Sequence, residues 1–504
     1  MTSSANTPLP TLATLLPGMS LPAALAGISV KGLCLDSRLI EPGQLFIAIP
    51  GTRADGRDYL PQVLAADAVA ALAEADGLDC RDPRVIPVEG LNRQLSELAG
   101  RFYGDPSASL LLTGITGTNG KTTCSLLLAQ LFSLAGYPAG VIGTLGCGVA
   151  RDGQVALTET GMTTPDAITL QALLADFVNA SVDRVAMEVS SHSLDQCRVS
   201  ALEFDTAVFT NLSRDHLDYH DDLASYAHAK SRLFTLPGLS HAVINIDDPV
   251  GAEMTLQLPP SVALYTYSLC NPAAAVYASD ITFSASGLQA NVITPWGEGL
   301  LVSPLLGRFN LQNLLAVLAA ACIQGLPLEQ VLSVLPGLQS VTGRMEKITK
   351  GVGPMVIVDY AHTPAALEQV LLTLREHCKG QLWCVFGCGG DRDRGKRGQM
   401  GAIASQLADR TIVTSDNPRS EKPDEIIADI VRGVAAGAVV DAIADRALAI
   451  QSAVWEAADA DVVLIAGKGH EHYQLIGAER LPFSDQAQAR LALKQRGGGR
   501  CFSR

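Results

Sequence analysis

The chain has 504 residues, of which 48% are hydrophobic and 17% are charged, and its formal net charge is −14. This length predicts about three domains, and the hydrophobic content predicts packed cores and excludes a mainly disordered chain. The acidic balance argues against a general nucleic-acid-binding protein, although a local basic pocket on an acidic protein can still bind small anions. The 11 cysteines show no spacing typical of a metal site, which favours reduced thiols in a cytoplasmic protein.

The N-terminus has no basic segment leading into an apolar stretch, so we expect no signal peptide. No apolar run in the sequence has the length needed to span a bilayer. We therefore expect a cytoplasmic protein without a membrane span or a nucleic-acid partner, and we expect it to be a monomer.

Residues 1–98 are predicted to form a small α/β domain. The apolar run at 45–49 predicts a strand that is ended by a Pro-Gly pair. A second apolar run lies near 69–72, and helical periodicity over 91–102 predicts a helix that leads into the next domain.

Residues 99–338 are predicted to form a central, doubly wound α/β domain. Several buried strands that end in polar loops are indicated, at 110–113, 185–187, 207–209 and 242–244. The order of strand, polar loop and helix is typical of a doubly wound sheet, and such sheets bind ligands at the carboxyl ends of their strands.

Residues 339–504 repeat this pattern and predict a third, Rossmann-like domain. Its four expected strands end in Asp or Gly-rich loops, and they lie at 355–358, 382–386, 411–414 and 462–465. The fold class predicted for the whole chain is therefore α/β, in three domains, with a P-loop-type sheet in the central one.

The run Gly-Thr-Asn-Gly-Lys-Thr-Thr, between a predicted strand and a predicted helix, indicates a phosphate-binding loop for ATP. Glycines let backbone N–H groups turn toward phosphate oxygens, and the helix N-terminus adds a positive dipole. Lys121 is suited to neutralise phosphate oxygens and Thr122 to hold Mg²⁺. The standard pattern has glycine at position 115, where this chain has Ile115. The predicted ATP-binding residues here are Gly117, Thr118, Asn119, Gly120, Lys121, Thr122 and Thr123.

A second polar cluster is expected at strand ends of the central domain. Glu188 follows the strand at 185–187, and a carboxylate beside a phosphate loop is a natural ligand for Mg²⁺. The run from 211 to 220 follows the next strand and is dense in polar residues. A solvated loop or a helix cap would explain each residue alone, but their position at the strand ends of one sheet favours a site.

Four motifs together resemble the Mur ligase family: Gly-Thr-Asn-Gly-Lys-Thr-Thr at 117, Glu-Val-Ser-Ser-His at 188, Asp-His-Leu-Asp-Tyr-His at 215 and Gly-Lys-Gly-His-Glu at 467. They occur in order across essentially the whole chain. The resemblance implies an ATP-dependent ligase of peptidoglycan synthesis. ATP would phosphorylate a substrate carboxylate, an amine would attack the acyl phosphate, and an amide would remain. Cations are needed because the reactants carry like charges.

The resemblance also implies roles for individual residues. Lys121, Glu188, His216 and Lys230 would be catalytic, and Thr122, Glu188, His216 and Lys230 would form the metal side. Lys230 would be carbamylated, because an anionic oxygen suits Mg²⁺ better than an ammonium does. Without the resemblance, an ordinary surface lysine would be preferred. Three further residues would bind ATP: Asn310 at the adenine, Arg344 at the phosphates and Asp359 at the ribose.

For the nucleotide-sugar substrate, UDP-N-acetylmuramoyl-L-alanyl-D-glutamate, the resemblance implies two groups of residues. In the first domain they are Leu35, Ser37, Thr52, Arg53 and Ala54. In the central domain they are Thr163, Thr164, Ser190, Gln196 and Arg198. The planar guanidinium of Arg198 suits a substrate carboxylate. The related pattern has Asn before the two threonines where this chain has Met162, so Met162 is left out of the predicted site.

The run Asp-Asn-Pro-Arg at 416 accompanies meso-diaminopimelate rather than lysine in the family. Diaminopimelate carries a second carboxylate, which Arg419 can bind bidentately, and an arginine left unpaired disfavours lysine. Glu471 is suited to hold the distal ammonium. A type I turn with a solvated arginine is the alternative interpretation of this run. The predicted set is Arg392, Asp416, Asn417, Pro418, Arg419, Gly467 and Glu471.

Three other functions are compatible with parts of the sequence. A folylpolyglutamate synthase shares the ligase chemistry, but the extra N-terminal domain and the Asp-Asn-Pro-Arg run argue against it. A lysine-adding relative would differ in the amino acid that it uses. A non-catalytic nucleotide-binding regulator would bind ATP without releasing phosphate in response to a substrate.

Overall fold

The computed structural model describes residues 8–51, 54–213, 215–216, 219–284, 286–349 and 353–500, with side chains as far as 496. The chain forms two compact units. The first contains Met1–Ala275 and Ala316–Pro327, and the second contains Val276–Leu315 and Leu328–Arg504. The division into domains at 1–98, 99–338 and 339–504 stays a prediction.

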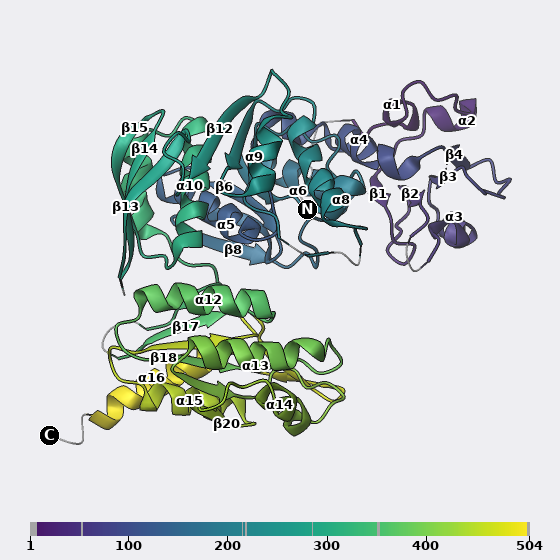
Figure 1. Ribbon diagram of the computed structural model, residues 1–504. Coiled ribbons are helices and arrows are strands. Elements are labelled where there is room, and N and C mark those ends of the chain that lie inside the picture. Colours follow the sequence, from purple (N-terminus) through teal and green to yellow (C-terminus); the bar gives the residue numbers. More distant parts are fainter. Residues whose placement is uncertain are drawn as a thin grey trace. The chain divides into compact units, whose positions relative to one another are not determined.

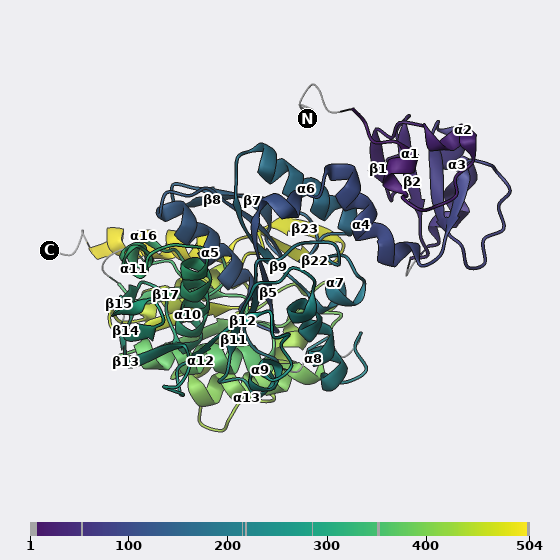
Figure 2. The ribbon, with the colours of Figure 1, turned by 90° about the horizontal axis from the view of Figure 1, so that it is seen from above.

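The first unit begins with a parallel sheet in the order β1-β2-β3-β4. Figure 2 shows this sheet from above, with β1 and β2 labelled. Its strands are β1 (Gly32–Cys34), β2 (Gln44–Ala48), β3 (Ala70–Glu74) and β4 (Val85–Val88). Leu45 and Ile47 pack with helices α1 (Leu12–Leu15), α2 (Ala23–Ala26) and α4 (Leu91–Tyr103). Phe46 and Ala48 point to the other face and pack with α3 (Leu60–Ala65), because side chains alternate along a strand. The strand expected at 45–49 and the helix expected at 91–102 are confirmed.

The larger sheet of the first unit has the order β12-β11-β10-β5-β9-β6-β7-β8. It is parallel from β12 to β6, and β7 and β8 are antiparallel. Its strands are β5 (Leu111–Thr116), β6 (Ala139–Gly143), β7 (Gly146–Arg151), β8 (Gln154–Thr158), β9 (Arg184–Glu188), β10 (Thr206–Phe209), β11 (His241–Asn245) and β12 (Ala263–Ser268). Its helices are α5 (Lys121–Leu134), α6 (Ala167–Asn179), α7 (Ser191–Asp195), α8 (Leu223–Ser231) and α9 (Pro249–Thr255).

The register of this sheet brings three loops together. Thr116 at the end of β5 pairs with Phe209 at the end of β10, and Ile115 pairs with Glu188 at the end of β9. Because these strands are parallel, the loops that follow them meet at one edge of the sheet. The phosphate loop therefore lies between the two polar loops that the sequence marked.

The second unit contains an antiparallel group, β13 (Val276–Ser284), β14 (Gly287–Thr294) and β15 (Gly297–Ser303). Helix α10 (Arg308–Ile323) begins in this unit and continues into the first.

A six-stranded sheet follows in the order β16-β17-β21-β18-β19-β20, parallel except for β16. Its strands are β16 (Glu346–Lys347), β17 (Met355–Asp359), β18 (Leu382–Phe386), β19 (Arg410–Val413), β20 (Val440–Ala442) and β21 (Val462–Ala466). A hairpin of β22 (Tyr473–Ile476) and β23 (Glu479–Pro482) lies beyond β21 in the chain.

Helices cover both faces of the six-stranded sheet. Figure 1 shows α12 and α13 on one side and α15 and α16 on the other. One core joins Ile357 and Leu464 to α12, α13 and α14, and the other joins Val356 and Val463 to α15 and α16. The helices on the two faces are α12 (Pro364–His377), α13 (Gly395–Leu407), α14 (Pro423–Val431), α15 (Arg446–Glu456) and α16 (Asp485–Arg500), and α11 (Leu328–Val334) precedes them in the chain. The α/β fold class is confirmed, with helices on both faces of this sheet as the Rossmann-like prediction requires.

A fully buried ion pair joins α15 to α16. Arg446 donates from Nε and Nη2 to the two carboxylate oxygens of Asp485 at 2.7 and 2.8 Å, and neither side chain is exposed. Arg446 also donates to the carbonyl oxygens of Ser415 and Ala466. The helix pair and two strand ends therefore depend on one buried guanidinium.

Arg446→Met is expected to destabilise the second unit by about 3–5 kcal/mol, because it leaves Asp485 as a buried charge without its partner. Urea unfolding followed by tryptophan fluorescence measures this, because all 3 tryptophans lie in the second unit. The double variant Arg446→Met/Asp485→Leu should recover part of the loss. Arg375→Met is the control: its pair with Asp409 is exposed and is worth less than about 1 kcal/mol. Equal midpoints for Arg446→Met and Arg375→Met would contradict this account.

Candidate active site

The phosphate loop lies between β5 and α5, as predicted. Gly117 and Gly120 have φ angles of +144° and +89°, which favour glycine. A Cβ at Gly117 would lie 1.9 Å from Oγ1 of Thr210, so a side chain has no space there. Lys121 begins α5 and donates from Nζ to the carbonyl oxygens of Gly117 and Thr118 at 2.8 and 3.0 Å. The loop thus has the backbone geometry and the cation of a phosphate site.

The loop after β10 holds the phosphate loop in place. Asn211 accepts from the N–H of Thr118 with its backbone oxygen, at 2.8 Å, and from the N–H of Asn119 with its side chain, at 3.0 Å. Thr118 Oγ1 accepts from the N–H of Ser213 at 2.9 Å, and Thr210 Oγ1 donates to the carbonyl of Asn119 at 2.6 Å. Asn211 and Thr210 were not among the predicted site residues, although the dense polar run at 211–220 marked this loop.

Glu188 lies at the end of β9 and is buried. Its Oε1 accepts from the N–H of Thr144 at 2.7 Å, and its Oε2 accepts from Oγ1 of Thr144 at 3.1 Å. Thr122 of the phosphate loop also donates a hydrogen bond to it. Burial raises the pKa of this carboxyl group, and the nearby ammonium of Lys121 opposes that rise. Two predicted metal-side residues, Thr122 and Glu188, are therefore in contact, and both present oxygen atoms.

Lys230 is also buried, on α8. Its Nζ donates to the carbonyl oxygen of Gly117 at 2.8 Å and lies 4.4 Å from the ring centre of Tyr226. Burial lowers the pKa of this ammonium well below its usual value, and repulsion from Lys121 lowers it further. The surface lysine that the sequence alone would favour is excluded, because the side chain is 1% exposed.

His216 does not join the other predicted metal-side residues. Its ring lies near those of His192 and Tyr226, with centres 5.1 and 6.0 Å away, and its Nε2 lies 3.7 Å from Asp215. In the described part of the chain, no hydrogen bond joins it to Glu188, Thr122 or Lys230. The backbone of His216 is left-handed, with φ of +53°. Its predicted metal role stays a prediction.

Six of the ten residues predicted for the nucleotide-sugar substrate fall into two connected places: Leu35, Gln196 and Arg198 in one, and Thr163, Thr164 and Ser190 in the other. A pocket of about 170 Å³ is lined by Leu35, Ile49, Asn92, Leu95, Met162, Asp166, Ala167, Gln196 and Arg198. Beside Glu188, Thr164 donates to the carbonyl of Glu188 at 2.9 Å and accepts from the N–H of Ser190 at 3.1 Å. Thr163 contacts Oγ1 of Thr144 at 3.0 Å. Arg198 connects the two places, because its Nη1 donates to the carbonyl of Thr164 at 2.8 Å.

Several predicted residues lie outside that pocket. Ser37 is buried and does not line it, and Ala54 is exposed. Thr52 and Arg53 lie outside the described residues. Met162 lines the pocket although the sequence pattern excluded it, and Nη1 of Arg198 lies 3.8 Å from its sulfur. A methionine supplies apolar contact where the family pattern has an amide.

In the second unit, two of the three additional ATP-binding residues come together. Asp359 at the end of β17 is buried and accepts from the N–H groups of Met345 and Ala361 at 2.7 and 2.8 Å. Burial raises its pKa, and the charge of Arg344 opposes that rise. The Arg344 guanidinium lies 5.0 Å from the ring centre of Tyr360. Asn310 is buried elsewhere, at the start of α10, where its amide donates to the carbonyl of Leu306 at 2.8 Å.

The predicted amino-acid-binding residues gather at the ends of β18, β19 and β21. Asn417 donates to Oε2 of Glu471 at 2.9 Å. A Cβ at Gly467 would lie 2.5 Å from Oδ2 of Asp416. A Cβ at Gly389 would lie 2.8 Å from Nη1 of Arg419 and 3.6 Å from Cγ of Arg392, so the two arginines flank one glycine.

Lys468 is the central residue of this cluster, and the sequence analysis missed it. The side chain is fully buried, and Nζ donates to Oδ1 of Asn417 at 3.0 Å and to Oε2 of Glu471 at 2.9 Å. It also lies 3.7 Å from Asp416. Its place inside the Gly-Lys-Gly-His-Glu motif was the available signal, because a charged residue enclosed by glycines at a strand end is typical of a site.

Three family descriptions match successive parts of the chain. They are "Mur ligase family, catalytic domain" over residues 29–103, "Mur ligase middle domain" over 115–321 and "Mur ligase, glutamate ligase domain" over 343–469. A curated UDP-N-acetylmuramoyl-L-alanyl-D-glutamate–2,6-diaminopimelate ligase of Ectopseudomonas mendocina is 51% identical over 476 residues, which cover 94% of this chain and 97% of the relative. The chain therefore belongs to the Mur ligase family.

Other relatives agree. The ligase of the same name from Pseudomonas aeruginosa is 52% identical, over 94% of this chain and 96% of that protein. A solved structure of a ligase with this name has a TM-score of 0.77 and 37% identity, and covers 97% of this chain and 99% of that one. A MurF ligase of Thermotoga maritima in complex with ADP, at 16% identity over 94% of this chain and 99% of its own, shares the fold with a TM-score of 0.62. The family predicted from the four motifs is confirmed.

In the described part of the chain, no helix is long and apolar enough to cross a bilayer.

Gly117→Ala is expected to weaken the binding of a fluorescent ATP analogue at least about tenfold, because the methyl group would displace Thr210 and the loop that it holds. Gly136→Ala, at the other end of α5, is the matched control. Its φ of +93° is also strained for alanine, but no atom lies within 4 Å of the added Cβ. Equal losses of affinity in both variants would show that backbone strain alone, rather than the crowded loop, is responsible.

Proposed function

We propose that this Mur ligase joins meso-2,6-diaminopimelate to UDP-N-acetylmuramoyl-L-alanyl-D-glutamate at the expense of ATP, in peptidoglycan precursor synthesis. The observation that carries this proposal is the pair of arginines, Arg392 and Arg419, that flank Gly389 beside the cluster of Asn417 and Glu471. Two guanidinium groups suit a carboxylate that lysine lacks. Relatives at 51% and 52% identity carry this activity in their names.

The first unit would hold the triphosphate and the carboxylate to be phosphorylated. Backbone N–H groups of the phosphate loop and the N-terminus of α5 would bind phosphate oxygens, and Nζ of Lys121 already lies at this loop. Mg²⁺ would neutralise charge on the transferred phosphoryl group when bound. Thr122 and Glu188 would hold it, and the fit is favourable because both offer oxygen atoms and the buried carboxylate of Glu188 gains from a cation. Arg198 would orient the acceptor carboxylate.

Lys230 would contribute as a carbamate. Its lowered pKa favours the neutral amine, whose lone pair can attack the carbon of CO₂. A C–N bond forms, one proton leaves the nitrogen, and the product carries one negative charge on its oxygens. That anion would replace a destabilised buried ammonium with an oxygen ligand.

The acyl phosphate formed on the substrate would then receive the amine of the amino acid. In the second unit, Arg419 and Arg392 would bind the distal carboxylate, and Glu471 would bind the distal ammonium. Lysine would satisfy Glu471 and leave the arginines without a partner. This difference in pairing is what would separate the two amino acids.

Phosphate release in the presence of ATP, Mg²⁺ and UDP-muramoyl-dipeptide tests the function. We expect release with meso-diaminopimelate and at least about a hundredfold lower kcat/KM with lysine, because a polar site discriminates strongly against a missing charged group. Arg419→Ala should lose kcat/KM for diaminopimelate while ATP binding changes by less than about twofold. Release stimulated by lysine or by a folate instead would overturn the proposal. Equal losses in both measurements for Arg419→Ala would remove the role given to Arg419.

Lys230→Ala should reduce kcat at least about a hundredfold, and a small carboxylic acid such as formate or acetate should restore part of it. The added carboxylate can occupy the space of the carbamate and supply its oxygens. Lys121→Ala is the control, because a carboxylate cannot replace a cation at the phosphates, and the acid should not restore its activity. A fully active Lys230→Ala enzyme would refute the carbamate.

A further inference from the structure

A buried arginine joins the two loops that carry Arg392 and Arg419. Arg397 lies on α13, and its side chain has no exposed surface. It donates from Nη1 and Nη2 to Oε2 and Oε1 of Glu421 at 2.9 and 2.8 Å, and from Nη1 to Oδ2 of Asp429 at 2.9 Å. These charge-assisted bonds lower the pKa of Glu421 to about 2, so its carboxylate stays ionised at neutral pH.

Glu421 in turn holds the loop that contains Arg392. Its Oε1 accepts from the backbone N–H of Asp391 at 2.7 Å. The carboxylate of Asp391 reaches back to the other loop, where it accepts from the N–H and the hydroxyl group of Ser420 at 3.1 and 2.5 Å. The N–H of Gly390 donates to the carbonyl of Asn417 at 2.9 Å. The two loops are thus connected at several successive positions.

Both loops contain a strained residue next to these contacts. Asp391 and Arg419 have φ angles of +53° and +51°, in the left-handed region that residues other than glycine rarely adopt. Such a conformation persists where the surroundings impose it. The N–H of Arg419 donates to the carbonyl of Leu475, and its carbonyl accepts from the N–H of Gly477, so the β22–β23 hairpin fixes its backbone. The left-handed backbone directs the Arg419 side chain toward the other loop, where Nη1 donates to the carbonyl of Gly390 at 2.8 Å.

We propose that Arg397 is a positioning residue, which acts through Glu421 and Asp391 to fix the spacing of Arg392 and Arg419 for one carboxylate of the amino-acid substrate. This proposal rests on the proposed function. Arg397 is too deeply buried to bind the substrate itself. A displacement of about 1 Å between two groups that must bind one carboxylate is enough to weaken binding strongly.

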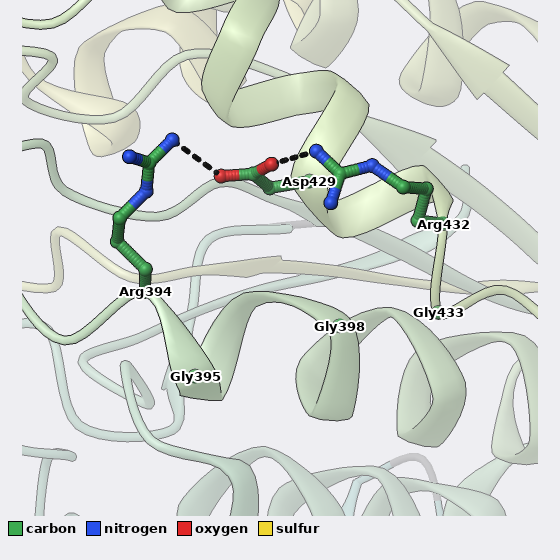
Figure 3. Close-up of a pocket in the computed structure, with 6 residues that line it drawn as sticks. All are labelled: Arg394, Gly395, Gly398, Asp429, Arg432 and Gly433. Atoms are coloured by element: carbon green, nitrogen blue, oxygen red, sulfur yellow. Dashed lines mark hydrogen bonds and ion pairs between the residues drawn. The ribbon is translucent and has the colours of Figure 1, made fainter.

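The far end of the network provides a matched control. Figure 3 shows Asp429 between Arg394 and Arg432, and each of these arginines is paired with it. Arg432 is largely exposed, and in the described part of the chain no hydrogen bond or ion pair joins its side chain to either loop. It belongs to the same ion network as Arg397 but lies outside the path to Arg392 and Arg419. If the network only stabilised the fold, substitutions of Arg397 and Arg432 would differ in their effect on the free energy of unfolding and not in their effect on KM.

Asp391→Gly is the most direct test. Glycine adopts a φ of +53° without strain and keeps the N–H that Glu421 accepts, so the substitution removes the carboxylate bonds to Ser420 and the charge interaction with Arg419. We expect the KM for diaminopimelate to rise about tenfold or more, with less than about a twofold change in the KM for ATP and for UDP-muramoyl-dipeptide. Arg432→Ala should leave all three constants unchanged. An unchanged KM for diaminopimelate in Asp391→Gly would overturn the proposal.

Arg397→Lys and Arg397→Met test the buried end. Lysine keeps the charge but cannot bind Glu421 bidentately, so its KM for diaminopimelate should lie between those of the wild type and Arg397→Met. If Arg397→Met does not fold, Asp391→Gly and Arg397→Lys decide the question. An equal rise of all three KM values in the folded variants would contradict a positioning role.

The two proposals fail in different ways. A wild-type enzyme that does not use diaminopimelate would overturn the proposed function, and this proposal with it. A wild-type enzyme that uses diaminopimelate, with variants whose KM values are unchanged, would overturn this proposal alone.

Discussion

The second unit depends on three cations that are buried completely: Arg397, Arg446 and Lys468. A buried charge is stable only when it is paired and its hydrogen bonds are satisfied, so each cation restricts the groups around it. Arg446 binds the strand ends at Ser415 and Ala466, and Lys468 binds Asn417 and Glu471. Together with the contacts of Arg397, these bonds determine where the loops after β18, β19 and β21 lie. The predicted amino-acid site is built on those loops.

The first unit uses the same constraint in another form. Two ammonium groups, on Lys121 and Lys230, donate to the single carbonyl of Gly117. Burial lowers the pKa of the Lys230 ammonium, and repulsion from the nearby ammonium of Lys121 lowers it further. The arrangement becomes favourable if one amine is neutral or is converted to an anion. The chemistry proposed for Lys230 is therefore a consequence of its burial beside a phosphate loop.

The sequence predicted what local pattern and local chemistry determine. The strands at 110–113 and 185–187, the loop glycines and the helix that starts at Lys121 all appear where the motifs indicated. Position 117 requires glycine because of its φ angle and the closeness of Thr210, and a glycine that is required in this way can be recognised in the sequence. Two groups of the site residues that the family resemblance implied are close together in space. One group is Thr122, Glu188 and Thr164, and the other is Asn417, Arg419 and Glu471.

Residues whose roles depend on distant partners were not predicted. Thr144 binds Glu188 because β6 happens to be the neighbour of β9, and strand order is not visible in local pattern. The antiparallel strands β13–β15 were not predicted either, although Leu288, Ala290 and Val292 of β14 are buried and alternate with exposed residues as in a half-buried strand. Lys468 has the appearance of an exposed loop lysine until the positions of Asn417 and Glu471 are known. Pairing across loops, rather than composition, determines these roles.

The charges around Lys468 add an argument about specificity. The buried carboxylates of Asp416 and Asp485 and the partly exposed carboxylate of Glu471 lie among two buried cations, Lys468 and Arg446, which interact with them electrostatically. With all five of these groups ionised, this end of the proposed site carries one negative charge in excess. The other end has the guanidinium groups of Arg392 and Arg419. A ligand that carries an ammonium and a carboxylate on one carbon matches both ends at once. The distal centre of diaminopimelate has this arrangement, whereas the side chain of lysine would balance the acidic end and leave the basic end unpaired.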